Sequence, residues 1–381
     1  MHGNTVSAPP HNLDSPPGPS VIVDGDEYLY FGGTGYLGLQ RHPEVIRAAK
    51  DAVEQFGIHT ATSRTNCVCP ALVTAEAAVA DYFGTETALL LPSGYASAQA
   101  VVQAVANDYD AFFLDADAHY ALHDAAALAG RPTHAFASRD ARALEESLQR
   151  NLSPNERPLV LTDGVFASSG WLAPVRDYVR CLAAWPGAGL VLDDAHGVGC
   201  LGDNGRGVLD HAECMTRANV LDQDGVYLYW CATASKALGG YGGIVAGDAG
   251  FVGRVRHASH WHDGATPLPA AMAAATARSV ALAEDPTLRS NLKQNVIRVR
   301  DGLRDLGLSV PQLPSPIVGL STEEPRAMKT LHADLLRRGV LVPLLSSYSG
   351  VDPGGVLRIT VFADHTTAMI DRLLDELRAL I

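Results

Sequence analysis

Five short apolar runs recur between residues 88 and 230, and alanine-rich helical segments separate them. The runs are Ala88 to Leu91, Ala111 to Leu114, Leu159 to Thr162, Leu190 to Leu192 and Val226 to Trp230. Apolar strands that alternate with helices are typical of a parallel sheet covered on both faces. We therefore expect a large α/β domain with a mostly parallel sheet, whose ligands bind at the carboxyl ends of the strands.

The segments on either side of this alternation have a different character. Residues 1–20 hold five prolines without periodicity, which favours a mobile tail. In residues 21–60 we expect a hairpin around Asp24-Gly25-Asp26, followed by a helix that Pro43 opens and that ends near Gly57.

The chain after Pro269 mixes helical and extended patterns of modest length. We expect helices at 270–282, 288–306, 325–338 and 366–380, and extended segments at 316–320 and 356–361. These elements suit a small α+β domain packed against the large one. The predicted organisation is therefore a large domain over residues 61–285 and a small C-terminal domain over 286–381.

Composition excludes several classes of partner. The net charge of −13 argues against nucleic acid and anionic membranes, because both require a basic surface. No stretch approaches the length of a membrane span, and the N-terminus lacks an apolar signal core. The six scattered cysteines are typical of reduced thiols, so we expect a cytoplasmic location.

Two stretches place reactive side chains directly after strands. The first is Val191-Leu192-Asp193-Asp194-Ala195-His196-Gly197, and the second is Thr233-Ala234-Ser235-Lys236-Ala237-Leu238-Gly239-Gly240. A partly buried lysine among small neighbours can form a Schiff base with an aldehyde cofactor. An aspartate at a nearby strand end can keep a pyridine nitrogen protonated. Either stretch alone is more often a plain loop, but together they predict a pyridoxal phosphate (PLP) enzyme.

Further residues fit this interpretation. Ser93-Gly94-Tyr95 opens a helix after a strand, where backbone amides can bind phosphate, although a plain helix cap is the alternative. His119 could stack on the cofactor or be structural. His196 could hydrogen-bond the phenolic oxygen of the cofactor, and Thr233 could contact its phosphate.

Two charged features remain. Arg358 lies inside an apolar strand, where a cation needs a partner: either a substrate carboxylate or a structural salt bridge. His257, His260, His262 and Asp263 do not match a zinc-site spacing, so we expect no metal.

The chain resembles the α-oxoamine synthase family of fold type I PLP-dependent transferases from about Val21 onward. The resemblance rests on Tyr36-Leu37-Gly38-Leu39, Ser63-Arg64, Ser93-Gly94-Tyr95, Asp163-Gly164-Val165-Phe166, Asp193 to Gly197, Ser235 to Gly239 and Thr266-Pro267-Leu268-Pro269. It implies a homodimer with shared active sites. The resemblance also implies a role for each site residue. Lys236 bonds the cofactor, Asp193 pairs with its ring nitrogen, His119 stacks on the ring and His196 contacts the phenolic oxygen. Thr233 contacts the phosphate, Thr266 contacts the phosphate in the neighbouring subunit, and Arg358 binds the substrate carboxylate.

The departures from the family pattern fall on substrate contacts. Thr34-Gly35 stands where the family has Asn-Asp/Asn, and Ala167 where it has serine. Pro70-Ala71-Leu72 and the segment Leu344 to Ser349 also differ from the family. The leading prediction is decarboxylative condensation of an amino acid with an acyl thioester. An aminotransferase is the alternative, and a non-catalytic PLP-binding module is the third reading.

Overall fold

The structure is a computed structural model that describes residues 11–214, 225–321, 325–351 and 354–381. Residues 1–10 of the predicted tail lie outside the described residues. The remaining part of that tail packs against the hairpin, because Asp14 donates its backbone N–H to the Ile22 carbonyl at 2.8 Å and Leu13 bridges to Val23. Within the described chain, no helix combines the length and the apolarity needed to cross a bilayer.

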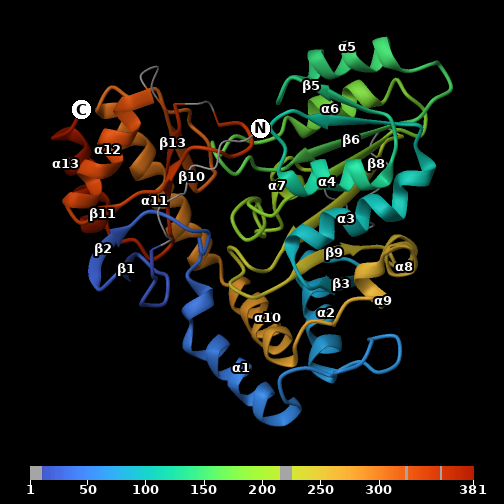
Figure 1. Cartoon of the computed structure of the whole chain (residues 1–381), viewed down its shortest axis with the longest axis horizontal. Helices are drawn as coiled ribbons and strands as arrows, with labels where there is room; N and C mark the ends of the chain where they lie inside the picture. The colour runs from blue at the N-terminus through green and yellow to red at the C-terminus, as the bar shows by residue number, and fades with distance from the viewer. Residues whose placement is uncertain (1–10, 215–224, 322–324, 352–353) are drawn as a thin grey trace, which may run out of the picture.

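A seven-stranded sheet forms the centre of the larger part (Figure 1), with strand order β3-β9-β8-β7-β6-β4-β5. Its strands are β3 (Thr87–Leu91), β4 (Ala111–Asp115), β5 (Thr133–Phe136), β6 (Pro158–Asp163), β7 (Gly189–Asp193), β8 (Tyr227–Thr233) and β9 (Gly243–Gly247). All neighbours pair in parallel except β9, which runs antiparallel to both β3 and β8. The mostly parallel sheet and all five predicted strands are confirmed.

The sequence analysis did not predict β5 and β9. Strand β5 is a short edge strand with exposed positions, so it lacks a continuous apolar run. Strand β9 is bounded by Gly243 and Gly247, and it follows β8 through a connection without a helix. A connection that short joins neighbouring strands only in the antiparallel direction, which explains the reversal of β9.

Alternate residues of each strand enter two separate cores, one on each face of the sheet. In β7, Leu190 and Leu192 enter one core and Val191 the other. The Val191 side packs against α3 (Gly94–Val105), α4 (Tyr120–Ala129) and α8 (Ala249–Ala258). The opposite side packs against α2 (Pro70–Phe83), α5 (Ala141–Asn151) and α6 (Val175–Leu182). This two-sided burial is the physical reason why the strands read as continuous apolar runs.

The smaller part contains two three-stranded sheets. In one, β13 (Val356–Thr360) lies between β10 (Ile317–Leu320) and β12 (Leu344–Leu345), antiparallel to both. The segment Leu344 to Ser349, which replaces a loop of the family pattern, thus begins with a strand. The helices of this part are α11 (Pro286–Asp305), α12 (Pro325–Arg337) and α13 (Thr367–Arg378).

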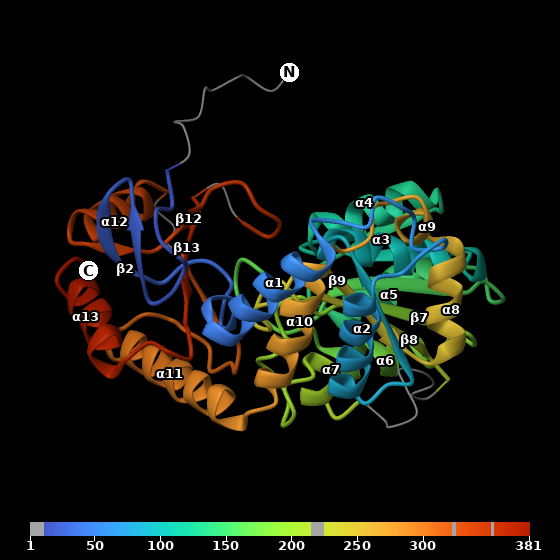
Figure 2. The same cartoon turned by 90° about the horizontal axis from the view of Figure 1, so that it is seen from below.

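The predicted hairpin joins the C-terminal elements. Strands β1 (Ser20–Val23) and β2 (Asp26–Tyr30) pair antiparallel around the turn at Asp24 and Gly25. Strand β2 also pairs in parallel with β11 (Val340–Leu341), so the second sheet unites both ends of the chain. Figure 2 shows this hairpin on the same side of the molecule as α12 and α13.

Two helices run between the two parts of the molecule (Figure 2). Helix α1 (Pro43–Phe56) begins at Pro43 and ends before Gly57, as predicted, and it packs along α10 (Ala270–Ala283). The short elements are η1 (Leu39–Arg41), η2 (Ala106–Asp108), α7 (Val208–His211) and α9 (His260–Asp263). The turn between β2 and η1 approaches the carboxyl edge of the large sheet, which brings N-terminal residues to the strand ends.

Candidate active site

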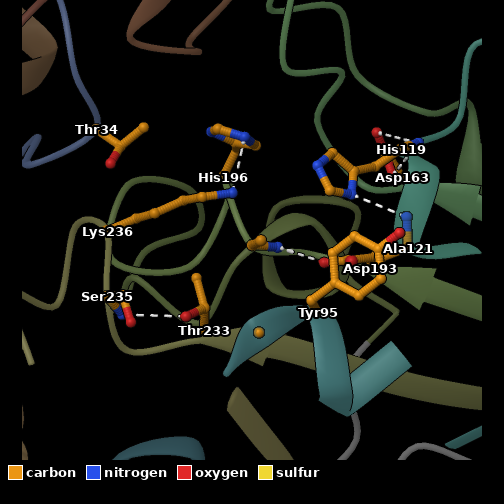
Figure 3. Close-up of a pocket in the computed structure, with 12 residues that line it drawn as sticks. Thr34, Tyr95, His119, Ala121, Asp163, Asp193, His196, Thr233, Ser235 and Lys236 are labelled. Atoms are coloured by element: carbon orange, nitrogen blue, oxygen red, sulfur yellow. Dashed lines mark hydrogen bonds between the residues drawn. The ribbon is translucent and has the colours of Figure 1, made fainter. Parts of the chain in front are cut away.

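A cavity of about 330 Å³ lies at the carboxyl ends of β6, β7 and β8 (Figure 3). Seven residues predicted to form the site line it: Gly94, Tyr95, His119, Asp193, His196, Thr233 and Lys236. The other lining residues are Thr34, Ala121, Asp163, Ala195 and Ser235. The structure therefore gathers side chains separated by up to two hundred residues of sequence.

Lys236 follows β8, and Figure 3 shows its side chain extending toward His196. Its Nζ lies 2.9 Å from His196 Nε2. Burial lowers the pKa of Lys236 to about 8, and the nearby carboxylate of Asp193 only partly opposes this effect. A substantial fraction of this amine is therefore neutral near pH 8, the state that attacks an aldehyde.

Asp193 is the last residue of β7, and its carboxyl group is buried. One oxygen, Oδ1, accepts a hydrogen bond from the Ala195 amide at 3.1 Å. Burial raises the pKa of Asp193, while Lys236 and His119 act in the opposite direction. Among the described residues no arginine or lysine forms a salt bridge with it, so a cationic ring nitrogen in the cavity would supply the partner that this carboxylate lacks.

Asp163 is a cavity residue that the sequence analysis used only as part of a family motif. It ends β6 and lies opposite Asp193 in the parallel register. Its two carboxyl oxygens lie 3.1 and 3.2 Å from the backbone N of His119, which donates to them. Burial and the adjacent Asp193 raise the pKa of Asp163 well above its ordinary value. The signal was present in the sequence, because Asp163 follows the apolar run Leu159 to Thr162 just as Asp193 follows its own.

His119 sits at the N-terminus of α4, where its Nδ1 accepts the Ala121 N–H at 3.1 Å. This hydrogen bond fixes the ring, which lies edge-on to Tyr95 with centroids 5.9 Å apart. Burial lowers the pKa of His119, so the ring is held neutral. A neutral, fixed imidazole at the cavity wall is suited to stacking on a flat aromatic ligand.

The start of α3 forms the phosphate end of the cavity. The Ser93 hydroxyl caps the helix by accepting the Ala96 N–H at 3.2 Å, and Ser93 does not line the cavity. Gly94 lies so close to Thr233 that a Cβ built at position 94 would be 2.8 Å from the Thr233 Cβ. Thr233 Oγ1 donates to the Gly242 carbonyl at 2.8 Å and accepts from the Ser235 amide at 3.1 Å. The first amides of a helix have no intrahelical acceptor, so this end of the cavity suits an anion.

Arg358 lies in β13 and is buried, outside the residues that line the cavity. Its guanidinium donates to four oxygens, those of Ala167 O (2.5 Å), Gly33 O (3.0 Å), Thr360 Oγ1 (2.8 Å) and Tyr36 Oη (3.2 Å). None of these acceptors is a carboxylate. In the described chain Arg358 has no salt bridge, so its charge has no carboxylate counterion.

Tyr36 connects Arg358 to the lysine, and the sequence analysis assigned it no role. Its hydroxyl lies 2.6 Å from His196 Nδ1 and 3.2 Å from Arg358 Nη2. A continuous series of hydrogen bonds thus runs from Arg358 through Tyr36 and His196 to Lys236. No local pattern predicts this link, because the residues come from four separate segments of the chain.

Two predicted features lie elsewhere. Thr266 is exposed and outside the cavity. In the histidine-rich segment, His260 Nδ1 lies 3.7 Å from Asp263 Oδ1, and burial lowers the pKa of His262 to about 4. The described residues contain no cluster of three or more potential metal ligands.

The chemistry of the cavity fits PLP. The neutral amine of Lys236 matches an aldehyde, and the unpaired carboxylate of Asp193 matches a protonated ring nitrogen. The ring of His119 offers a stacking surface, and the start of α3 offers an anion site. These four groups line one cavity, and each would contact a different part of PLP.

Comparisons with known proteins agree with this assignment. The family model for class I and II aminotransferases matches residues 27–377. The chain is 35% identical to 8-amino-7-oxononanoate synthase of Methylococcus capsulatus, covering 96% of this chain and 92% of that protein. It is 33% identical to the Nitrosococcus oceani protein of the same name, covering 96% and 94%.

Solved structures share the fold over nearly the whole chain. Serine palmitoyltransferase of Sphingomonas wittichii superposes with a TM-score of 0.88 at 25% identity, covering 97% of this chain and 91% of that one. The 8-amino-7-oxononanoate synthase of Francisella tularensis gives 0.76 at 19% identity, covering 92% and 97%. The predicted fold type I architecture is confirmed. The chain belongs to the class I and II aminotransferase family and, within it, to the PLP-dependent α-oxoamine synthases.

Proposed function

We propose that the protein catalyses the decarboxylative condensation of an amino acid with an acyl thioester. The products of such a reaction are an α-amino ketone, carbon dioxide and a free thiol. The observation that carries the proposal is the presence of Lys236 and Asp193 in one cavity, as a base and as a partner for the cofactor ring. The guanidinium of Arg358 lies outside that lining and is linked to Lys236 through Tyr36 and His196. The names and the near-complete coverage of the relatives support the same reaction.

Three residues of the chain have separate roles in this reaction. When bound, PLP supplies an aldehyde and an electron sink for negative charge at the amino acid α-carbon. Lys236, with its pKa near 8, takes a proton from that carbon and returns it. Asp193 holds the proton on the ring nitrogen from its buried position at the end of β7. Arg358 orients the substrate through the carboxylate.

The amino acid substrate is proposed to be larger or more apolar than glycine. Thr34 lines the cavity where the family has an asparagine, and Ala167 contributes only its backbone carbonyl to Arg358. Fewer side-chain hydrogen bonds therefore hold the carboxylate. Contacts with a larger side chain would supply the missing binding energy.

Product analysis tests the reaction. A panel of amino acids is incubated with and without acyl-CoA donors, and free thiol and carbon dioxide are measured. We expect thiol release that requires both substrates, with a larger amino acid preferred over glycine. Amino transfer to a keto acid without thiol release would replace the proposal with an aminotransferase, which the same lysine and aspartate could serve.

We also propose a homodimer with shared active sites. Thr266 is exposed and outside its own cavity, which is consistent with a contact to the cofactor phosphate of the neighbouring subunit. Such a dimer would also cover exposed apolar side chains on and around α1 and α2, namely Ile46, Val53, Ile58, Val68 and Val73.

Mixing of two variants tests the shared site. Thr266→Ala should weaken PLP retention. Added Lys236→Ala protein supplies an intact Thr266 but cannot bond the cofactor, so mixed dimers should recover retention. Sedimentation as a monomer, or weak retention that mixing leaves unchanged, would contradict the shared site.

The cytoplasmic location remains a proposal that rests on the scattered cysteines of the sequence. Cell fractionation tests it directly. Recovery of the protein outside the cytoplasmic fraction would overturn it.

A further inference from the structure

The hydroxyl of Tyr36 occupies a buried position between two charged or titratable groups. Its oxygen lies 3.2 Å from Arg358 Nη2 and 2.6 Å from His196 Nδ1. These are the hydrogen-bond partners of the hydroxyl within the described residues. Tyr36 is fully buried, and burial raises the pKa of its phenol, so the group carries its proton.

The direction of each hydrogen bond follows from the donors present. A guanidinium only donates, so the Tyr36 oxygen accepts from Arg358. The phenol proton then needs an acceptor, because a buried donor without a partner costs free energy. His196 Nδ1 is the acceptor that the geometry offers. In a neutral imidazole whose Nδ1 accepts, the proton resides on Nε2.

The consequence reaches the lysine. His196 Nε2 lies 2.9 Å from Lys236 Nζ, so a proton on Nε2 makes the imidazole a donor and the amine an acceptor. An ammonium group cannot accept, which means that this arrangement favours the neutral amine. The opposite tautomer would present a bare Nε2 and would favour the ammonium form instead.

We propose that Tyr36 is a positioning residue that holds the proton of His196 on Nε2 and thereby presents an N–H donor to the reactive amine of Lys236. The same N–H is available to the phenolic oxygen of PLP, the acceptor that the sequence predicts for His196. The inference deepens the proposed function and rests on it for the roles of Lys236 and His196. It makes no assumption about the substrate.

The first test observes the tautomer directly. Apoenzyme labelled with ¹⁵N-histidine is studied by NMR, and the His196→Gln variant identifies the His196 signals. We expect a protonated Nε2 and a bare Nδ1 in the wild type, and a mixture of tautomers in Tyr36→Phe. A wild-type spectrum with the proton on Nδ1 would overturn the proposal without any tyrosine variant.

The second test measures the amine. Acetylation of Lys236 in the apoenzyme is followed against pH by peptide mass spectrometry. In Tyr36→Phe, a part of the His196 population no longer carries the proton on Nε2 and no longer donates to the amine. The loss of this neutral hydrogen bond should raise the pKa of Lys236 by about one. The other charged groups that act on this amine, Asp193, Asp163, Arg358 and Asp194, remain in the variant. Arg358 loses its hydrogen bond to Tyr36 but keeps those to Ala167, Gly33 and Thr360.

The control is Tyr82→Phe. Tyr82 is also buried and donates one hydrogen bond, to the Gly205 carbonyl at 3.0 Å, but it does not line the cavity. Its variant should leave both the His196 tautomer and the Lys236 pKa as in the wild type. An unchanged tautomer and pKa in Tyr36→Phe would reduce Tyr36 to a packing residue. Both tests use apoenzyme, so a failure of the proposed reaction leaves their outcome readable.

Discussion

Asp163 and Asp193 lie opposite one another at the ends of β6 and β7, and both carboxyl groups are buried. Two neighbouring carboxylates cannot both ionise easily away from water. The pKa of Asp163 is raised well above its ordinary value, by burial first and then by Asp193. Asp163 therefore tends to keep its proton, which leaves the negative charge to Asp193, beside the cofactor cavity.

Asp163→Asn should change how stability depends on pH. An acid whose pKa is higher in the folded state lets the unfolded chain release its proton first, so stability falls as pH rises above about 4. Asparagine keeps an oxygen for the His119 amide and removes this penalty. Urea unfolding of the apoenzyme should show that the free energy of unfolding of the variant, relative to that of the wild type, increases as the pH rises from 4. A difference that does not vary with pH would contradict the raised pKa.

Lys236→Ala should fold but lose the visible absorbance of the lysine-bound cofactor. The lysine follows β8 on the surface of the cavity, so its truncation disturbs little packing. In the wild type, capture of PLP by the apoenzyme should become faster as pH rises toward about 8, because the free amine increases through the pKa of Lys236. Absorbance spectra and stopped-flow mixing measure both effects. A variant that keeps the absorbance would place the bond at another lysine.

Asp193→Asn should retain PLP but lose most of its turnover. The anion site at the start of α3 and the Lys236 amine are unchanged, so binding persists. Asparagine cannot keep the ring nitrogen protonated, and we expect a loss on the order of a hundredfold. Cofactor titration beside steady-state assays separates the two quantities. Near-normal turnover would remove Asp193 from the mechanism.

The sequence predicted the sheet because its strands are buried on both faces. The runs that became β3, β4, β6, β7 and β8 are continuous and apolar. Strand β5 is exposed and short, and β9 is flanked by glycines, so neither leaves such a pattern. The pairing of β2 with β11 joins residues about three hundred positions apart, which no local pattern encodes.

Site residues could be predicted from the sequence only where the residue type and its immediate neighbours along the chain indicate the chemistry. Lys236 and Asp193 satisfy that condition, since each follows an apolar strand. Tyr36 does not, because its role depends on the direction of two hydrogen bonds to residues 160 and 322 positions away. The unpaired state of Arg358 likewise became visible only with its four acceptors in place.

Gly94→Ala should weaken PLP binding. A methyl group at this position would lie 2.8 Å from the Thr233 Cβ, so the start of α3 must shift away from the phosphate end of the cavity. The matched control is Gly253→Ala in α8, where a Cβ meets nothing within 4 Å. That change should stabilise the protein by about 0.5–1 kcal/mol and leave the affinity for PLP unchanged. Equal PLP affinity in both variants would contradict a tight fit at Gly94.

The last prediction concerns the choice of amino acid. Thr34 lines the cavity at the position of the family's asparagine, and Ala167 replaces its serine near Arg358. The double variant Thr34→Asn with Ala167→Ser restores polar groups that can hold a carboxylate. Each hydrogen bond to a charged group contributes roughly 1.5–3 kcal/mol, so KM for glycine should fall by about tenfold or more.

The preference for larger amino acids should weaken in the same variant, because tighter binding of the carboxylate makes contacts with the side chain less decisive. Thiol release at varied glycine concentrations, beside a larger amino acid, measures both changes. Gly253→Ala is the control: it lies in α8, whose residues do not line the cavity, and it should leave the ratio of the two KM values as in the wild type. A double variant whose KM for glycine stays at the wild-type value would show that the residues at positions 34 and 167 do not determine how tightly the substrate carboxylate is bound.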